Sequence, residues 1–453
     1  MSAAEFTRAA REFHEGYAAT ADPDLLERAI ELHRRAAEAA APGDPLLPRY
    51  LSNLAVALSD RYDLTSALAD LTDAIETAEA ALRGTPEGAP ERGTRLGNLG
   101  VFLSDRYDRL GDLDDLDTAL DLLTEAAGEG DPWSADTARA HSNLSMLWLD
   151  RYERTRRPAE LDASVLAAEA AVQATPSGSA DLPGYLNNLG NAHRMRYERT
   201  AEDGVAGAGA QGRFAIEVAD LLVAVEAYRR AVELCPAGSP YRPKFLTNLG
   251  NVLLDRWAVL QDGDDFTESV AVLTAAVEAT PAGSPDLTGR LNNLAVTLQH
   301  GEPAHHPRAA GLFRTCCEHG LEAGVEGALM AAENWGRWAL ERRAFAEASE
   351  AYGFAWRAAD RLYRTQAGRS YKQTWLLSFT GLSAGAALAA ARSGDVPSAA
   401  LALERGRAML LAEALERDRA ELDDLAAHRP DLSRRYLAAA EHVRSLDARG
   451  ITY

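Results

Sequence analysis

Hydrophobic residues along the chain recur at the spacing of one helix face, and this spacing occurs twice in each of several similar blocks. In one block Leu51, Leu54 and Leu58 follow a helical period, and Leu71 and Ile75 do so after a short break. Each block therefore predicts two helices joined as a hairpin. Because one hairpin cannot bury its apolar face alone, stacking on its neighbours would supply the missing surface.

An Asn-Leu pair marks the first helix of each block and recurs six times. The marker asparagines are Asn53, Asn98, Asn143, Asn188, Asn248 and Asn293. Their successive steps are 45, 45, 45, 60 and 45 residues. The long step holds 15 extra residues, 60 minus 45, around the Gly/Ala-rich stretch from Gly204 to Gly212. Such a composition indicates a flexible loop insertion.

The second helix of a block ends at a recurring stop signal. The signal is Thr85-Pro86, Thr175-Pro176, Cys235-Pro236 or Thr280-Pro281, each followed two residues later by glycine. Proline after the last turn and glycine beyond it are typical of helix C-termini. The regular stop signals support a hairpin in every block.

The repeat spacing also organises the two ends of the chain. Counting back 45 residues from Asn53 leads to Arg8, which indicates a degenerate first repeat, as expected where a stack has no further neighbour. We expect a capping repeat over 1–45, six repeats over 46–300 with a loop insertion near 201–213, a break with a degenerate helix pair over 301–330, and further helices over 331–453.

Composition and charge narrow the possible partners. The chain is 47% hydrophobic and 25% charged, which is typical of a folded soluble protein, and its net charge is −21. So acidic a surface repels phosphate backbones and anionic membranes, whereas basic peptides or protein patches remain possible partners. Three cysteines make no disulfide framework, and we find no signal peptide and no membrane span. A cytoplasmic location is expected.

Two segments carry a resemblance to a known family. The block Tyr185–His193, followed by Ala227–Pro236, resembles the tetratricopeptide repeat, whose usual period is 34 residues. Long repeats of this kind look like those of actinobacterial proteins. The resemblance implies an all-α, right-handed α-solenoid of helix hairpins. It also implies a non-catalytic scaffold or sensor that binds a protein or peptide in its concave groove.

The C-terminal part resembles a more specific arrangement. Asn334–Tyr352 is close to a standard tetratricopeptide unit, and the later segment Glu404–Leu411 reads E-x-G-R-x-x-L-L. This segment resembles the helix that precedes the caspase-like CHAT domain in TPR–CHAT proteins. The alternative function is therefore the regulatory N-terminal arm of such a protease, with the catalytic domain beyond residue 453 or absent. A purely structural homo-oligomer is a third possibility.

The candidate binding residues lie on the first helices. The resemblance implies that the six marker asparagines line the concave groove, where an amide can bond a ligand backbone. Seven residues after four of them stand Asp60, Asp105, Asp150 and Asp255. Seven residues is nearly two helical turns, so both sets would share one face and form a polar, acidic groove. In the alternative interpretation each Asn bonds a neighbouring helix and each Asp is simply solvated.

An Arg-Tyr pair recurs after each acidic position. The pairs are Arg61-Tyr62, Arg106-Tyr107, Arg151-Tyr152 and Arg196-Tyr197. We interpret them as structural, with Tyr packed between repeats and Arg paired with nearby acidic residues.

Other residues with chemical potential give weaker signals. Cys316 and Cys317 are adjacent and have no second Cys/His cluster at zinc spacing, so we expect an inert thiol pair. His305-His306 beside Pro307 reads as a loop break, and Trp335, Trp338 and Trp356 read as helix core. No phosphate-binding G-x-x-x-x-G-K-[ST] motif occurs. The sequence thus predicts no enzyme, no cofactor, no metal and no catalytic residue.

Overall fold

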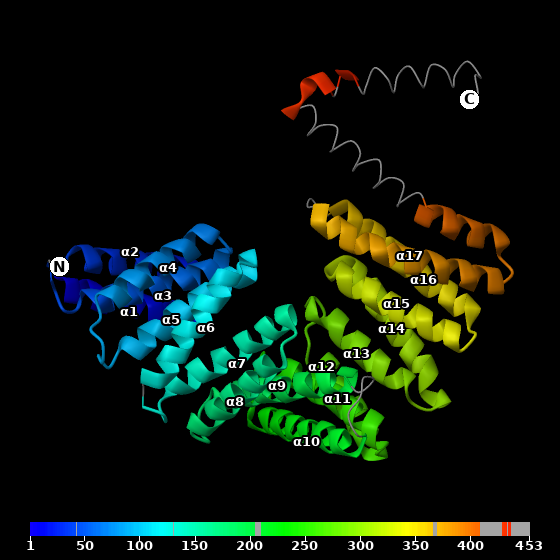
Figure 1. The fold of residues 1–453 in the computed structure, drawn as a ribbon, viewed down its shortest axis with the longest axis horizontal. Helices are drawn as coiled ribbons and strands as arrows, with labels where there is room; N and C mark the ends of the chain where they lie inside the picture. Colours follow the sequence, from blue (N-terminus) through cyan, green and yellow to red (C-terminus); the bar gives the residue numbers. More distant parts are fainter. Residues whose placement is uncertain are drawn as a thin grey trace. The chain divides into compact units, whose positions relative to one another are not determined.

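The computed structural model describes residues 1–41, 43–129, 131–203, 210–365, 369–407, 428–432 and 434–435 (Figure 1). Within these residues the fold is all-α, and the helices follow one another as hairpins, as the sequence pattern predicts. The chain forms two compact units, Met1–Ser269 and Val270–Tyr453. Among the residues that the structure describes, no helix is long and apolar enough to cross a membrane.

Six hairpins begin in the first unit. Their helices are α1 (Ala3–Thr20) and α2 (Pro23–Glu38), α3 (Leu47–Thr65) and α4 (Leu68–Arg83), α5 (Arg92–Leu110) and α6 (Leu113–Glu129), α7 (Ala135–Thr155) and α8 (Pro158–Ala174), α9 (Leu182–Asp203) and α10 (Ala210–Leu234), and α11 (Arg242–Leu260) and α12 (Gly263–Glu278). The boundary between the units falls inside α12. In the stretch near 201–213, α9 extends to Asp203 and α10 begins at Ala210, and residues 204–209 lie outside the described residues.

The second unit continues the hairpin series. Its elements after α12 are α13 (Asp286–Gln299), the 3-10 turn η1 (Pro303–His305), α14 (His306–Ala323), α15 (Val325–Glu341), α16 (Phe345–Thr365) and α17 (Arg369–Arg392). One apolar core runs through them and contains Phe313 and Trp335. The loop break expected at His305-His306 is wrong, because His305 ends η1 and His306 begins α14. Pro307 in the first turn suits a helix start, since its missing N–H needs no partner there.

Five of the first helices in Met1–Ser269 end in the same way. A residue in the left-handed conformation caps α1, α3, α5, α7 and α11; these caps are Ala21, Ser66, Gly111, Arg156 and Gln261, with φ between 54° and 74°. Each cap donates its backbone N–H to the carbonyl four residues earlier, which belongs to a tyrosine or, in α11, to Trp257. Four of the five caps are not glycine, so the turn is imposed by packing against local preference.

Arginine–carboxylate pairs close five of these hairpins, and we call them the clamps. They are Arg61–Asp70, Arg106–Asp115, Arg151–Glu160, Arg196–Asp220 and Arg256–Asp265, with N–O distances of 2.5 to 3.3 Å. In each, the arginine comes from the first helix and the buried acid from the second. Three of the arginines also reach an acid on the preceding second helix, at Glu27, Asp117 and Asp162. The structural interpretation of the Arg of Arg-Tyr is thereby confirmed.

Candidate binding surface on the first helices

All six marker asparagines are half-buried, and two of them bond the preceding first helix. Asn188 Nδ2 donates to Ser142 Oγ at 2.9 Å, and Asn248 Nδ2 donates to Asn187 Oδ1 at 2.8 Å. Each acceptor stands one residue before the marker of the neighbouring repeat. Asn188 and Asn248 thus hold adjacent hairpins together, as the alternative interpretation expects.

The other four markers differ from these two. Asn53, Asn98, Asn143 and Asn293 make no side-chain hydrogen bond within the described part of the chain. Gly97 stands where Asn143 would find its acceptor, and glycine has no side chain to offer. These four amides therefore keep both donors and acceptor available on the first helices.

Six carboxylates form a continuous series over the last turns of α3, α5 and α7, and we call this series the acidic row. Its members in order are Asp60, Asp63, Asp105, Asp108, Asp150 and Glu153. Electrostatic repulsion links Asp60 to Asp63, Asp63 to Asp105, Asp105 to Asp108, Asp108 to Asp150 and Asp150 to Glu153. Carboxylates from three successive repeats are therefore close enough to disfavour one another's ionisation.

The acidic row raises the pKa of its own members. Burial, with Asp63 and Asp108 adding repulsion, raises the pKa of Asp105 to about 7. Burial raises the pKa of Asp150 to about 6, with Asp108 and Glu153 adding to the shift and Arg154 opposing it. Burial also raises the pKa of Asp63 and of Asp108. Repulsion among these carboxylates therefore destabilises the folded state when they are ionised.

The four predicted aspartates do not all join this row. Asp60, Asp105 and Asp150 belong to it, whereas Asp255 Oδ2 pairs with Arg194 Nε of α9 at 2.7 Å. Met195 stands at the aspartate position of that repeat, so the row has no member on α9 at this position. Asp60 also contacts His14 of α1 through a short hydrogen bond.

Sequence reasoning missed half of the acidic row. Asp63, Asp108 and Glu153 stand ten residues after their marker asparagines, at Asn53, Asn98 and Asn143. Each stands three residues after an aspartate of the first set, so the two acidic positions are neighbours on the helix surface. An acid recurs at this second position in four successive blocks, at Asp63, Asp108, Glu153 and Glu198, and this recurrence was the available signal.

An open pocket of about 700 Å³ lies at the α7 end of the row. Its lining residues are Tyr107, Asp108, Asp150, Glu153, Arg154, Arg156, Met195 and Glu198. The two arginines lie over aromatic rings: Arg154 over Tyr107 at 5.9 Å and Arg156 over Tyr152 at 5.5 Å from the ring centroids. Arg154 Nε also donates to the Tyr107 hydroxyl at 3.2 Å. Four carboxylates against two tethered guanidiniums leave this pocket acidic.

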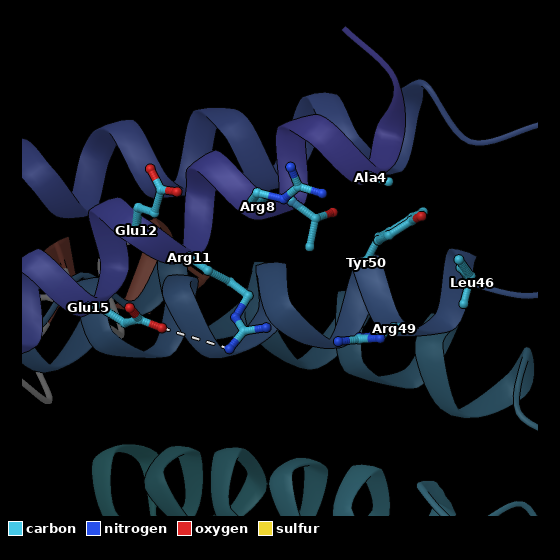
Figure 2. A pocket seen from close by; sticks show the side chains of 9 residues that line it. Ala4, Arg8, Arg11, Glu12, Glu15, Leu46, Arg49 and Tyr50 are labelled. Atoms are coloured by element: carbon cyan, nitrogen blue, oxygen red, sulfur yellow. Dashed lines mark ion pairs between the residues drawn. The ribbon is translucent and has the colours of Figure 1, made fainter.

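Two smaller pockets adjoin each other between α1 and α3, and we call them the pocket pair. One has a volume of about 290 Å³ and is lined by Arg8, Arg11 and Arg49, which surround it in Figure 2. The other has a volume of about 270 Å³ and is lined by His14 and His33 among others. Arg11 and Glu15 line both pockets, so the two pockets are immediate neighbours.

The cysteine pair offers no reactive thiol. Cys316 and Cys317 are fully buried in the core of the second unit. Cys316 Sγ donates to the Thr288 carbonyl at 3.0 Å, and burial raises the pKa of this thiol to about 12. Burial raises the pKa of the Cys317 thiol as well. Both groups therefore stay protonated, which confirms the interpretation as an inert pair.

Trp335 and Trp338 lie in the apolar core of the second unit, and Trp356 packs against it. Trp335 is fully buried and donates from Nε1 to Glu347 at 2.6 Å, and Trp338 is nearly as buried. Both belong to the apolar core, as the sequence predicted. Within the described residues, no three His, Cys, Asp or Glu side chains converge in a way that could hold a metal ion.

Comparison with known proteins identifies one of the repeats. Residues 49–86, which contain α3 and α4, match the family model described as "Tetratricopeptide repeat". The chain carries a tetratricopeptide repeat. The successive hairpins before and after it stack as in a tetratricopeptide solenoid. No curated protein matches the chain.

Several solved structures have a similar arrangement of helices. NprR, a quorum sensor from B. thuringiensis, covers 89% of this chain and 97% of its own, at 9% identity and a TM-score of 0.45. The C-terminal part of a TPR repeat-containing protein from Cytophaga hutchinsonii covers 72% of this chain and 98% of its own, at 11% identity and a TM-score of 0.40. BtubC from P. vanneervenii covers 57% of this chain and 91% of its own, at 15% identity and a TM-score of 0.37. Identities and TM-scores this low say nothing about what the chain binds.

Proposed function

We propose that the chain is a protein-binding scaffold whose acidic row takes a segment rich in lysine or arginine. The observation that carries the proposal is the chain of mutual repulsion from Asp60 to Glu153, over three successive first helices. The repeat architecture supports a scaffold role, since stacked hairpins present one long surface to a partner.

Bound cations would relieve the strain that the row imposes on the fold. A lysine or arginine beside Asp105 or Asp150 favours the charged carboxylate and lowers its raised pKa. Binding near neutral pH would then release protons, because the free row holds part of its protons there. Asp60, Asp105 and Asp150 are half-buried, so solvent screens their charges less than it screens the exposed Asp63, Asp108 and Glu153. Asn98 and Asn143, on the same helices, would bond the backbone of the segment.

A labelled basic peptide tests the proposal. The probe is a fluorescein-labelled peptide of alternating lysine and alanine, and the readout is fluorescence anisotropy at moderate salt. We expect the triple variant D105N/D108N/D150N to bind it at least about tenfold more weakly, because the main attraction is removed. Since each changed residue is half-buried or exposed, circular dichroism should show the same helix content.

A second triple variant controls for net charge. Asp73, Glu76 and Asp121 are exposed on α4 and α6 and have no ion pair among the described residues. The variant D73N/E76Q/D121N removes the same number of carboxylates, and at least as much charge, away from the acidic row. It should bind the peptide nearly as well as the native chain. Equal losses in the two variants would show that only the overall charge attracts the peptide, and the row would not be a site.

The possible role as a CHAT-protease arm has no support among the described contacts. It depends on the segment Glu404–Leu411, of which residues 408–411 lie outside the described residues. We therefore propose the scaffold function alone. Self-association without any peptide, detected by light scattering during the same titrations, would indicate the structural oligomer instead.

A further inference from the structure

The pocket pair carries a positive excess, with Arg8, Arg11 and Arg49 against Glu12 and Glu15, whereas the acidic row carries charge of one negative sign. Arg8 and Arg49 are exposed and have no acidic partner within the described residues, and Arg11 forms a loose pair with Glu15 at 3.7 Å. The clamp arginines, in contrast, all lie within 3.3 Å of a buried acid. Because Glu15 occupies Arg11, and Arg8 and Arg49 form no ion pair in the described chain, two guanidiniums at this pocket remain available to carboxylates of a ligand.

A second and independent observation points to a ligand here. His33 lines the pocket pair and is 1% exposed, yet neither of its ring nitrogens has a hydrogen-bond partner. Burial, with His14 and Arg11 adding repulsion, lowers its pKa to about 4, so the ring is neutral near pH 7. A neutral imidazole offers one donor and one acceptor. Leaving both unused in a buried place is costly unless a ligand group meets them.

The pocket pair is continuous with the acidic row. His14 lines the pocket that contains His33 and bonds Asp60, the first member of the row. Asn53, a marker with no side-chain partner in the described chain, lines the same pocket. An extended ligand lying on the row therefore reaches the three arginines by continuing across α3 to α1.

We infer that the pocket pair holds acidic side chains of the same segment whose basic residues lie on the acidic row. This inference rests on the proposed function and adds an order to the ligand: acidic residues at one end and basic residues along the rest. A purely basic segment would leave Arg8, Arg11 and Arg49 unpaired and would be repelled by them. The surface therefore selects for charge order as well as for charge.

Peptides of equal composition and different order test the inference. One carries a glutamate block joined to a lysine block, made in both chain directions, and the other alternates glutamate and lysine. We expect one of the two block peptides to bind at least about tenfold more tightly than the alternating peptide, measured by fluorescence anisotropy. The variant R8A/R49A should remove this difference and leave the affinity for the lysine–alanine peptide unchanged or slightly higher.

The matched control removes two arginines elsewhere. Arg34 and Arg230 are exposed on α2 and α10 and have no ion pair within the described residues, so R34A/R230A should keep the preference for block order. If the lysine–alanine peptide binds the acidic row but block order makes no difference, this inference fails and the proposed function stands. If no basic peptide binds, the proposed function fails and the inference with it.

Discussion

Helix α5 contains two charged sites that are neighbours in sequence and opposite in effect. Arg106 pairs with buried Asp115 of α6 at 2.6 Å and closes the hairpin. Asp105, the residue before it, faces Asp63 and Asp108 and has a pKa raised to about 7. The clamp gives each charge a partner, whereas the acidic row gathers charge of one sign across three repeats.

This difference separates residues that stabilise the fold from residues that the fold tolerates. A buried carboxylate with a guanidinium partner is compensated, and removing one partner leaves the other uncompensated. Carboxylates that repel one another oppose folding above their normal pKa. Retaining such a series over three repeats is consistent with a surface shaped for a ligand. Each prediction below changes one side of this comparison.

Breaking one clamp should have the largest effect. Arg106→Met leaves Asp115 buried without its partner, and we expect the free energy of unfolding to fall by about 3 kcal/mol. The double variant R106M/D115L should recover most of this loss, because it leaves no buried charge. Urea denaturation followed by circular dichroism measures both.

An exposed pair supplies the control for the clamp. Arg139 and Asp136 of α7 are each about half exposed, so Arg139→Met should cost less than about 1 kcal/mol. A similar loss for Arg106→Met and Arg139→Met would mean that the clamps contribute no more than surface pairs. The distinction between the clamp and the acidic row would then disappear.

Neutralising the acidic row should have a smaller effect of opposite sign. Folding raises the pKa of Asp105, so the folded state binds this proton more tightly than the unfolded state does. Stability is therefore lost as pH rises from about 4 towards 7. We expect Asp105→Asn to raise the free energy of unfolding at pH 8 by about 1–2 kcal/mol, after allowance for solvent screening, with little change at pH 4. Urea denaturation at the two pH values measures the difference.

The environment of Asp105 defines the control for this pH effect. Asp63 and Asp108 are the charges that repel it, whereas Asp73 of α4 is exposed and has no ion pair in the described residues. Asp73→Asn should leave the pH dependence unchanged. If Asp105→Asn destabilised the chain at pH 8, Asp105 would have a favourable partner, and the acidic row would be misassigned.

Most of the fold could be predicted from the sequence, because helix hairpins follow from local periodicity and stop signals. The clamps also have a signal in the sequence. Arg61 and Asp70 are nine residues apart, as are Arg106 and Asp115, and the same spacing recurs in two further clamps. Only the clamp Arg196–Asp220, whose two residues flank the long insertion, departs from this spacing of nine residues. A constant spacing between opposite charges across a predicted turn therefore indicates such a pair.

The candidate binding surface could be predicted only in part. The aspartates at the seventh position after the markers were found, but Asp255 has its own cation, Arg194, which comes from a different repeat. Pairing across repeats depends on how neighbouring hairpins stack, and no spacing within one repeat reveals it. The pocket pair was missed for the same reason, because Arg8 and Arg49 belong to helices of different repeats.

His33 belongs neither to the clamps nor to the acidic row, and changing it should have the smallest effect on the free energy of unfolding. Its pKa is lowered, so the unfolded state binds more protons between about pH 4 and 6.5, and stability falls as pH falls through this range. His14 and Arg11 raise the cost of charging it, and Glu15 lines the same pocket. We expect His33→Leu to increase the free energy of unfolding by about 1 kcal/mol at pH 7, and by more at pH 5, because it removes an unsatisfied buried polar group.

The same variant should weaken binding of the preferred block peptide, since the ligand loses a hydrogen-bonding partner. A gain in stability together with a loss in affinity would place His33 with the acidic row, among the residues that the fold tolerates for the sake of a ligand. A loss in stability would place it with the clamps, as a group that the native packing requires. Urea denaturation and anisotropy on one preparation distinguish these outcomes.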